Sequence, residues 1–152
     1  MNTLDDVKKL RELTGAGILD CQKVLSKHAG DFDKAFQELK DKGLEVAEKK
    51  KDRATNQGLI EAYSHNGGKV VAVVEVLCET DFVARNEDFK YFAHELALQI
   101  SAMDPKSIEE LMAQTYIRDP KLTIDQLHKN LVAKIRENIQ ISRIARFELG
   151  VE

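Results

Sequence analysis

Residues 59–78 read LIEAYSHNGGKVVAVVEVLC, and this stretch decides the fold of the larger part of the chain. Two runs rich in β-favouring residues, Leu59–Ser64 and Lys69–Cys78, flank His65-Asn66-Gly67-Gly68. An Asn-Gly pair between such runs is a strong hairpin signal, because both residues tolerate the positive φ of a tight turn. The second run is almost continuously apolar and β-branched, as in a strand covered on both faces. We therefore expect a hairpin whose second strand is central in a sheet.

The residues that follow the hairpin favour helices and one closing strand. Asn86 can cap a helix with a long apolar stripe, and Ser107 and Thr123 can open two further helices. Residues 139–149 then alternate apolar and polar side chains, as a strand does. The sequence therefore predicts an α+β core domain over residues 58–152, in which helices cover a small antiparallel sheet in the order ββαααβ.

The first 43 residues have a different, helical pattern. Gly15, Gly30 and Gly43 each stand where a helix C-cap favours glycine, and Thr3 with Asp6 resembles a capping box. Three apolar stripes between these signals can close one small core. We expect a three-helix docking module over residues 1–43, followed by a charged linker or helix extension over residues 44–57.

Composition narrows the classes of partner and compartment. The 152 residues carry 23 Lys and Arg against 26 Asp and Glu, a net charge of -3, so we expect no nucleic-acid partner. No apolar run is long enough for a membrane span, and residues 1–10 lack the apolar stretch of a secretory signal. Cys21 and Cys78 lack the spacing of a disulfide framework or zinc knuckle. These features favour a cytoplasmic protein with reduced thiols and no membrane partner.

The usual catalytic and metal-binding patterns are missing. No GxxxxGK[ST] loop occurs, and Gly67-Gly68-Lys69 is better explained as a turn. His94-Glu95 begins an HExxH pattern, but Leu98 stands where the second zinc-binding histidine belongs. The histidines are dispersed along the chain, and a lone histidine is more often a packed or surface residue than a ligand. We expect no metal site, no cofactor and no enzymatic activity.

Two segments are harder to explain by packing alone. The first is Thr14–Cys21, TGAGILDC, in which Ile18 and Leu19 lie about 100° apart on a helix and cannot both face one small core. One of them is offered to a partner, or it simply covers the edge of the module. The second is Cys78–Asn86, CETDFVARN, where Phe82 is either a staple into the local core or an exposed anchor.

Both segments are similar to the signatures of the elongation factor Ts family, and residues 130–147 resemble its closing helix and strand. The resemblance implies an N-terminal module like a ubiquitin-associated domain. It also implies a guanine-nucleotide exchange factor that binds elongation factor Tu in its GDP-bound and nucleotide-free forms. Such a factor promotes GDP release during translation elongation by disturbing the magnesium and phosphate site of elongation factor Tu.

The resemblance also implies which residues bind the partner. These are Arg11, Ile18 and Leu19 in the N-terminal module, and Thr80, Asp81, Phe82 and Val83 after the central strand. In this family the phenylalanine corresponding to Phe82 enters a pocket of elongation factor Tu.

The chain lacks the second half-core of longer family members, so we expect a homodimer whose seam is the terminal strand, residues 139–149. The alternative to an exchange factor is a ubiquitin-binding or general protein-interaction adaptor without exchange activity. That alternative leaves the C-terminal half of the chain without a role.

Overall fold

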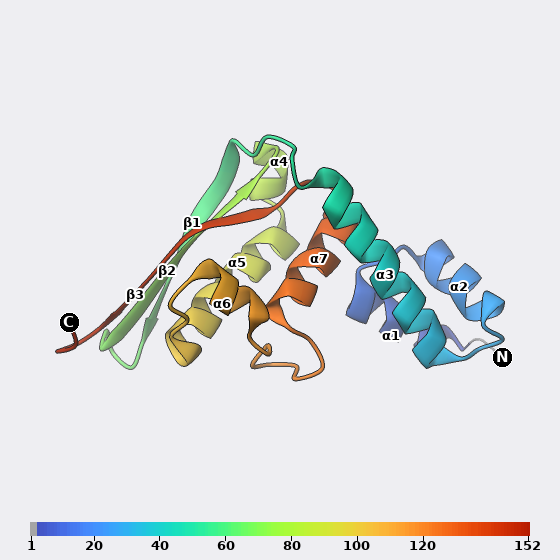
Figure 1. The fold of residues 1–152 in the computed structure, drawn as a ribbon, viewed down its shortest axis with the longest axis horizontal. Coiled ribbons are helices and arrows are strands. Elements are labelled where there is room, and N and C mark those ends of the chain that lie inside the picture. Colours follow the sequence, from blue (N-terminus) through green and yellow to red (C-terminus); the bar gives the residue numbers. More distant parts are fainter. Residues whose placement is uncertain (1–2) are drawn as a thin grey trace. The chain divides into compact units, whose positions relative to one another are not determined.

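A computed structural model describes residues 3–152 and confirms the predicted α+β class (Figure 1). No helix in this range is both long and apolar enough to cross a membrane. The order of elements adds a one-turn helix, α4, to the predicted ββαααβ. The elements are α1 (Leu4–Thr14), α2 (Ile18–Lys27), α3 (Phe32–Lys50), β1 (Gln57–His65), β2 (Val70–Cys78), α4 (Asp81–Ala84), α5 (Glu87–Met103), α6 (Ile108–Ala113), α7 (Ile124–Ile135) and β3 (Gln140–Glu148).

The described chain forms two compact units. The helical unit contains residues 3–52 and 129–137, and the sheet unit contains residues 53–128 and 138–152. The predicted domains are residues 1–43, 44–57 and 58–152. Compact units do not show which segments fold on their own, so this division stays a prediction.

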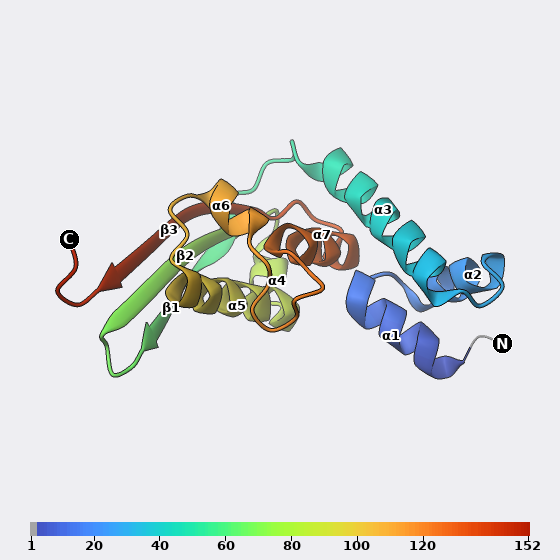
Figure 2. The same cartoon turned by 60° about the horizontal axis from the view of Figure 1, so that its bottom comes forward.

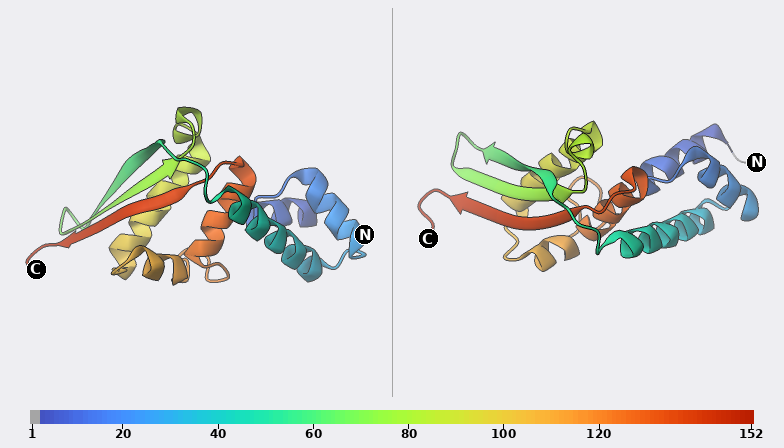
Figure 3. Two further views of the ribbon diagram at one scale, coloured as in Figure 1. Left: turned by 45° about the horizontal axis from the view of Figure 1, so that its top comes forward. Right: turned by 90° about the horizontal axis from the view of Figure 1, so that it is seen from above.

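The sheet unit is built on the predicted hairpin. β1 pairs with β2 in an antiparallel register from Gln57 opposite Cys78 to His65 opposite Val70. Asn66 and Gly67 in the turn have φ of 53° and 66°, the left-handed conformation that the Asn-Gly pair predicts. β3 pairs with the other edge of β2, so β2 is central, as expected (Figure 3).

Helix α5 covers one face of this sheet (Figure 2). Side chains of β2 alternate between this covered face, where Ala72, Val74 and Val76 are fully buried, and the opposite face, where Val71 and Val73 are only half-buried. The prediction that β2 is covered on both faces is therefore wrong. β-branched residues fit a pleated sheet surface whether or not another layer packs on it. A run of them therefore indicates a strand but does not show whether one or both of its faces are covered.

The helical unit has a core of buried residues from α1, α2 and α3, among them Leu10, Cys21 and Leu25. The predicted capping box at the start of α1 is present, since the Thr3 hydroxyl accepts the Asp6 N–H at 3.1 Å. The helix ends, as expected, at Gly15, whose φ of 70° is left-handed. These local signals therefore set the ends of α1 correctly.

Gly43 does not end a helix, and that prediction is wrong. Helix α3 continues through Gly43 to Lys50. Residues 44–50 are therefore a helix extension, which was one of the two possibilities for residues 44–57, the other being a linker. Gly43 is buried, and a Cβ added to it would lie 3.8 Å from the Cβ of Ala133 in α7. This is an ordinary van der Waals distance, so the space at Gly43 would also admit an alanine, and nothing local ends the helix here.

The second half of α7 packs in the helical unit as a fourth helix. The Asn130 side-chain amide donates to the Leu13 carbonyl at 2.7 Å, and Val132 is almost completely buried. A Cβ on Gly15 would lie 2.4 Å from the Asn130 carbonyl oxygen, so only glycine fits at this contact. Residues 129–137 of α7, far along the chain, thus pack with the three N-terminal helices in one compact unit.

One carboxylate links α2 to α3. Glu38 on α3 accepts from the ammonium of Lys27 at 3.0 Å and from that of Lys42 at 3.1 Å, and it lies 2.6 Å from the ring of His28. These partners, Lys27 first, lower the pKa of Glu38 from its ordinary 4.5 to about 2. The charged carboxylate therefore favours the folded state.

We predict that Glu38→Gln changes the response of stability to acid. A carboxyl group with a lowered folded pKa contributes stability above its ordinary pKa and loses it as the pH falls toward the folded value. The wild-type advantage over Glu38→Gln in urea unfolding should therefore be present at about pH 6 and shrink between about pH 4.5 and pH 2. Glu12→Gln, on exposed α1 surface, is the control. Parallel curves for wild type and Glu38→Gln would contradict this role.

Candidate functional site

The segment after β2 forms a single helical turn that presents one aromatic side chain. Thr80 caps α4 by accepting the Val83 N–H at 3.2 Å, and the Cys78 thiol donates to the Thr80 carbonyl at 3.1 Å. Asn86 caps α5 directly afterwards, accepting the N–H of Asp88 at 2.8 Å. Short-range hydrogen bonds thus hold the backbone on both sides of Phe82.

Neighbouring side chains on α4 have opposite environments. Phe82 is 81% exposed, whereas Val83 is 9% exposed and belongs to the core. Phe82 is therefore not a staple into the local core. Thr80, Asp81 and Phe82 are exposed and Val83 is buried, and all four stay predicted partner contacts in the sheet unit.

Charged residues on and beside α4 form ion pairs and hydrogen bonds. Asp81 pairs with Arg85 at 3.0 Å on the exposed side. Glu79, on the inner side, accepts the Asn138 N–H at 2.8 Å and lies 3.4 Å from the Arg53 guanidinium. Sequence reasoning missed Glu79 and Asn138, because residues so far apart in the chain give no local signal of their pairing.

The candidate contacts of the N-terminal module lie at the start of α2 and the end of α1. Ile18 is 49% exposed and Leu19 is 69% exposed, and Arg11 is exposed as well. The structure therefore presents both apolar residues, where the sequence required only one to leave the core. These three residues belong to the helical unit, whereas Thr80, Asp81 and Phe82 belong to the sheet unit.

The incomplete HExxH pattern has a structural explanation. Glu95 is only 3% exposed, and one of its oxygens accepts from the Tyr116 hydroxyl and the Arg118 guanidinium. Burial, followed by the hydrogen bond to Glu95, raises the pKa of Tyr116 above its ordinary value. His94 lies instead 3.6 Å from Glu61 on β1. Glu95 thus anchors the segment before α7 to α5.

Residues 3–152 contain no group of three or more His, Cys, Asp or Glu residues arranged to hold a metal ion. Both cysteines are buried and neither is in a disulfide, and burial raises the pKa of the Cys21 thiol.

Comparison with known proteins identifies relatives along the whole chain. The family model described as "Elongation factor TS" matches residues 79–152, beginning at the segment that carries Phe82. The elongation factor Ts of Caldanaerobacter subterraneus subsp. tengcongensis is 39% identical over 189 aligned positions, which cover 95% of this chain and 94% of that protein. The elongation factor Ts of Herpetosiphon aurantiacus is 38% identical, covering 97% of this chain and 98% of that protein. This chain belongs to the elongation factor Ts family.

The resemblance stated from the two sequence segments is therefore confirmed, and the family gives the chain a role in translation elongation. Relatives in the family differ in length. The elongation factor Ts of Clostridium kluyveri is 46% identical over 150 positions, which cover 99% of this chain but 49% of that protein. The present chain thus corresponds to one part of the longer form and to nearly all of the shorter ones.

We predict opposite effects on stability at two adjacent residues of α4. Val83→Ala removes buried methyl groups and should lower the free energy of unfolding by about 1–3 kcal/mol. Phe82→Ala removes an exposed side chain and should change it by about 0.5 kcal/mol or less. Thermal and urea unfolding of the two variants measure this. A larger loss for Phe82→Ala than for Val83→Ala would return Phe82 to the core.

Proposed function

We propose that this member of the elongation factor Ts family is a guanine-nucleotide exchange factor without enzymatic activity of its own. It binds elongation factor Tu in the GDP-bound and nucleotide-free forms and promotes GDP release in the cytoplasm. The observation that carries the proposal is Phe82, an aromatic side chain 81% exposed on a capped helical turn. Family membership supplies the partner.

Phe82 has the properties of an interface anchor. A large, rigid aromatic side chain contributes strongly when it enters a pocket of a partner, especially beside a charge. Asp81 and Arg85 provide charges on either side of it. In the proposed mechanism Asp81 and Phe82 press on elongation factor Tu near its magnesium site. Loss of that ion removes the largest local charge holding the diphosphate, and GDP leaves faster.

The helical unit contributes affinity in this proposal. Arg11, Ile18 and Leu19 form its exposed contacts with the nucleotide-binding domain of elongation factor Tu. Binding of the factor and binding of GDP are coupled, so GDP must weaken the hold of the factor by the same free energy. A thousandfold faster release requires a barrier lower by about 4 kcal/mol.

We predict that Phe82→Ala slows exchange while the protein stays folded. Loss of a buried anchor costs about 2 kcal/mol or more, which corresponds to roughly thirtyfold slower catalysed release. The measurement is release of mant-GDP from elongation factor Tu at several concentrations of the factor. Tyr91→Ala, which truncates another exposed aromatic residue in the sheet unit, is the matched control and should release GDP at the wild-type rate.

Wild-type release by Phe82→Ala would reject the proposed role of this residue. Absence of any stimulation by the wild-type protein would reject exchange activity itself. Capture of ubiquitin, without exchange on elongation factor Tu, would favour the adaptor alternative.

We also propose that the protein is a homodimer formed through the face of the sheet opposite α5. Ile60 is 60% exposed and Phe147 is 69% exposed on this face. Between the strands lies a shallow hollow of about 260 Å³ lined by Ile60, Val73 and Ala145, with the ion-paired Glu75 and Arg143. β3 is also an edge strand, so a second copy can cover both apolar surface and an open edge.

We predict sedimentation as a dimer at micromolar concentration, unchanged by reducing agent because both cysteines are buried and lie outside the proposed seam. Phe147→Asp places an unpaired charge in the apolar seam and should shift the protein to monomer. Asp125→Asn, a charge change outside this sheet, is the control. A wild-type monomer across the micromolar range would refute the dimer.

A further inference from the structure

A pocket of about 310 Å³ lies entirely within the helical unit. Its wall is formed by the loop between α1 and α2, by the second half of α3 and by the end of α7. Apolar parts of the lining come from all three segments, namely Ala16, Leu39, Val46 and Ala133. The pocket can therefore accept an aliphatic side chain.

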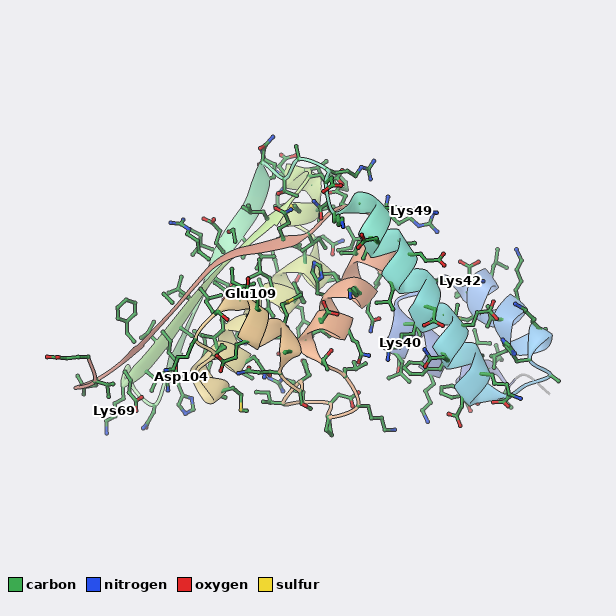
Figure 4. All side chains as sticks on the ribbon, viewed as in Figure 1. Lys40, Lys42, Lys49, Lys69, Asp104 and Glu109 are labelled. Carbon is green, nitrogen blue, oxygen red and sulfur yellow. The ribbon has the colours of Figure 1, made fainter. Side chains whose placement is uncertain are left out.

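Positive charge dominates the remaining lining. Lys42, Lys49, Lys50 and Arg136 face a single acid, Asp20. Lys42 is paired with Glu38 at 3.1 Å, whereas the other three cations have no ion pair within residues 3–152. Figure 4 shows Lys42 and Lys49 extending from α3. Three of the four cations that line the pocket are thus available to pair with an anion from outside the described chain.

The backbone adds to this preference for an anion. Gly17, which lines the pocket, is the N-cap of α2 and makes no side-chain capping hydrogen bond. The first N–H groups of that ten-residue helix therefore carry the positive end of its dipole toward the same region. Asp20, in the first turn, offsets part of this charge.

Arg136 adopts a conformation that usually belongs to glycine. It follows α7 with φ of 65°, and its N–H donates to the Val132 carbonyl at 2.8 Å. Glycine is preferred at this position after a helix because a Cβ is strained there. The chain thus holds a long cationic side chain at the pocket despite a backbone cost, which is the kind of outlier that points to function.

We propose that this pocket binds an acidic peptide segment of a protein partner, with one aliphatic side chain on the apolar floor and carboxylates at the basic rim. Nucleic acid fits less well, because no aromatic side chain lines the pocket for base stacking. The proposal does not depend on exchange activity, and it involves residues other than Arg11, Ile18 and Leu19.

The test uses the full-length chain labelled with ¹⁵N and the peptide acetyl-Glu-Glu-Leu-Leu-Glu-Glu-amide as the probe. Amide signals of Gly17 and Gly43, both in the pocket lining, should shift with added peptide. Signals of Gly67 and Gly68 in the hairpin should not. The shifts should weaken as NaCl is raised from about 20 to 300 mM, because exposed ion pairs are screened. The same peptide with lysine in place of glutamate should not bind.

Two variants separate binding from folding. Arg136→Gly relieves the backbone strain, so its melting temperature should equal or exceed that of the wild type while its affinity for the peptide falls about threefold or more. Combining it with Lys49→Gln should weaken binding about tenfold. Lys8→Gln, on α1 outside the pocket, is the control and should bind normally.

Wild-type affinity in the double variant would overturn the proposal and leave these cations a purely structural role at the helix ends. Shifts confined to residues outside the pocket would also overturn it. Stronger binding of a single-stranded oligouridine probe than of the acidic peptide would replace it with a nucleic-acid site.

Discussion

The packing of α5 against one face of β2 determines most of the sheet unit. Ala72, Val74 and Val76 on the strand are fully buried, and α5 contributes the fully buried Phe89, Leu96 and Ile100. Because successive strand residues point to opposite faces, this contact fixes which face stays open. It also fixes the end of β2, from which α4 turns Val83 inward and Phe82 outward. The exposed position of Phe82 and the open face of the sheet both follow because α5 covers only one face.

The helical unit depends on a different constraint, the fit between Gly15 and α7. Because Gly15 has no Cβ, the turn between α1 and α2 can lie directly against α7; any larger residue would overlap the Asn130 carbonyl. The Asn130 side-chain amide also donates to the Leu13 carbonyl at this contact. Gly43 of α3 is less restrictive, since a Cβ there would lie 3.8 Å from the Cβ of Ala133, an ordinary contact. Within this unit the basic pocket exists because residues 129–137 supply a wall that α1, α2 and α3 lack.

Local signals in the sequence predicted what depends on local chemistry. The Asn-Gly hairpin, the capping box at Thr3 and the glycine that ends α1 are all present. What failed depended on distant partners. A glycine such as Gly43 often ends a helix, but here it is buried within α3 near Ala133, a residue far along the chain. A run of β-branched residues likewise does not reveal how many layers cover a strand. For the candidate site, the sequence selected the segment around Phe82, but only the structure separates the exposed Phe82 from the buried Val83. The pairing of Glu79 with Asn138 had no local signal.

Exposure of Phe82 in the free protein has a consequence for the proposed exchange. A side chain already buried in its own core has little free energy left to gain in a partner's pocket, whereas an exposed phenylalanine gains it only on binding. The Thr80 cap and the buried Val83 hold α4 in place, which reduces the ordering cost of that binding. The binding free energy that Phe82 contributes can then weaken the binding of the nucleotide to the partner, because the two ligands are thermodynamically coupled. A disordered loop with the same residues would lose part of that gain to its own ordering, so the single capped turn after β2 matters as much as the aromatic side chain it carries.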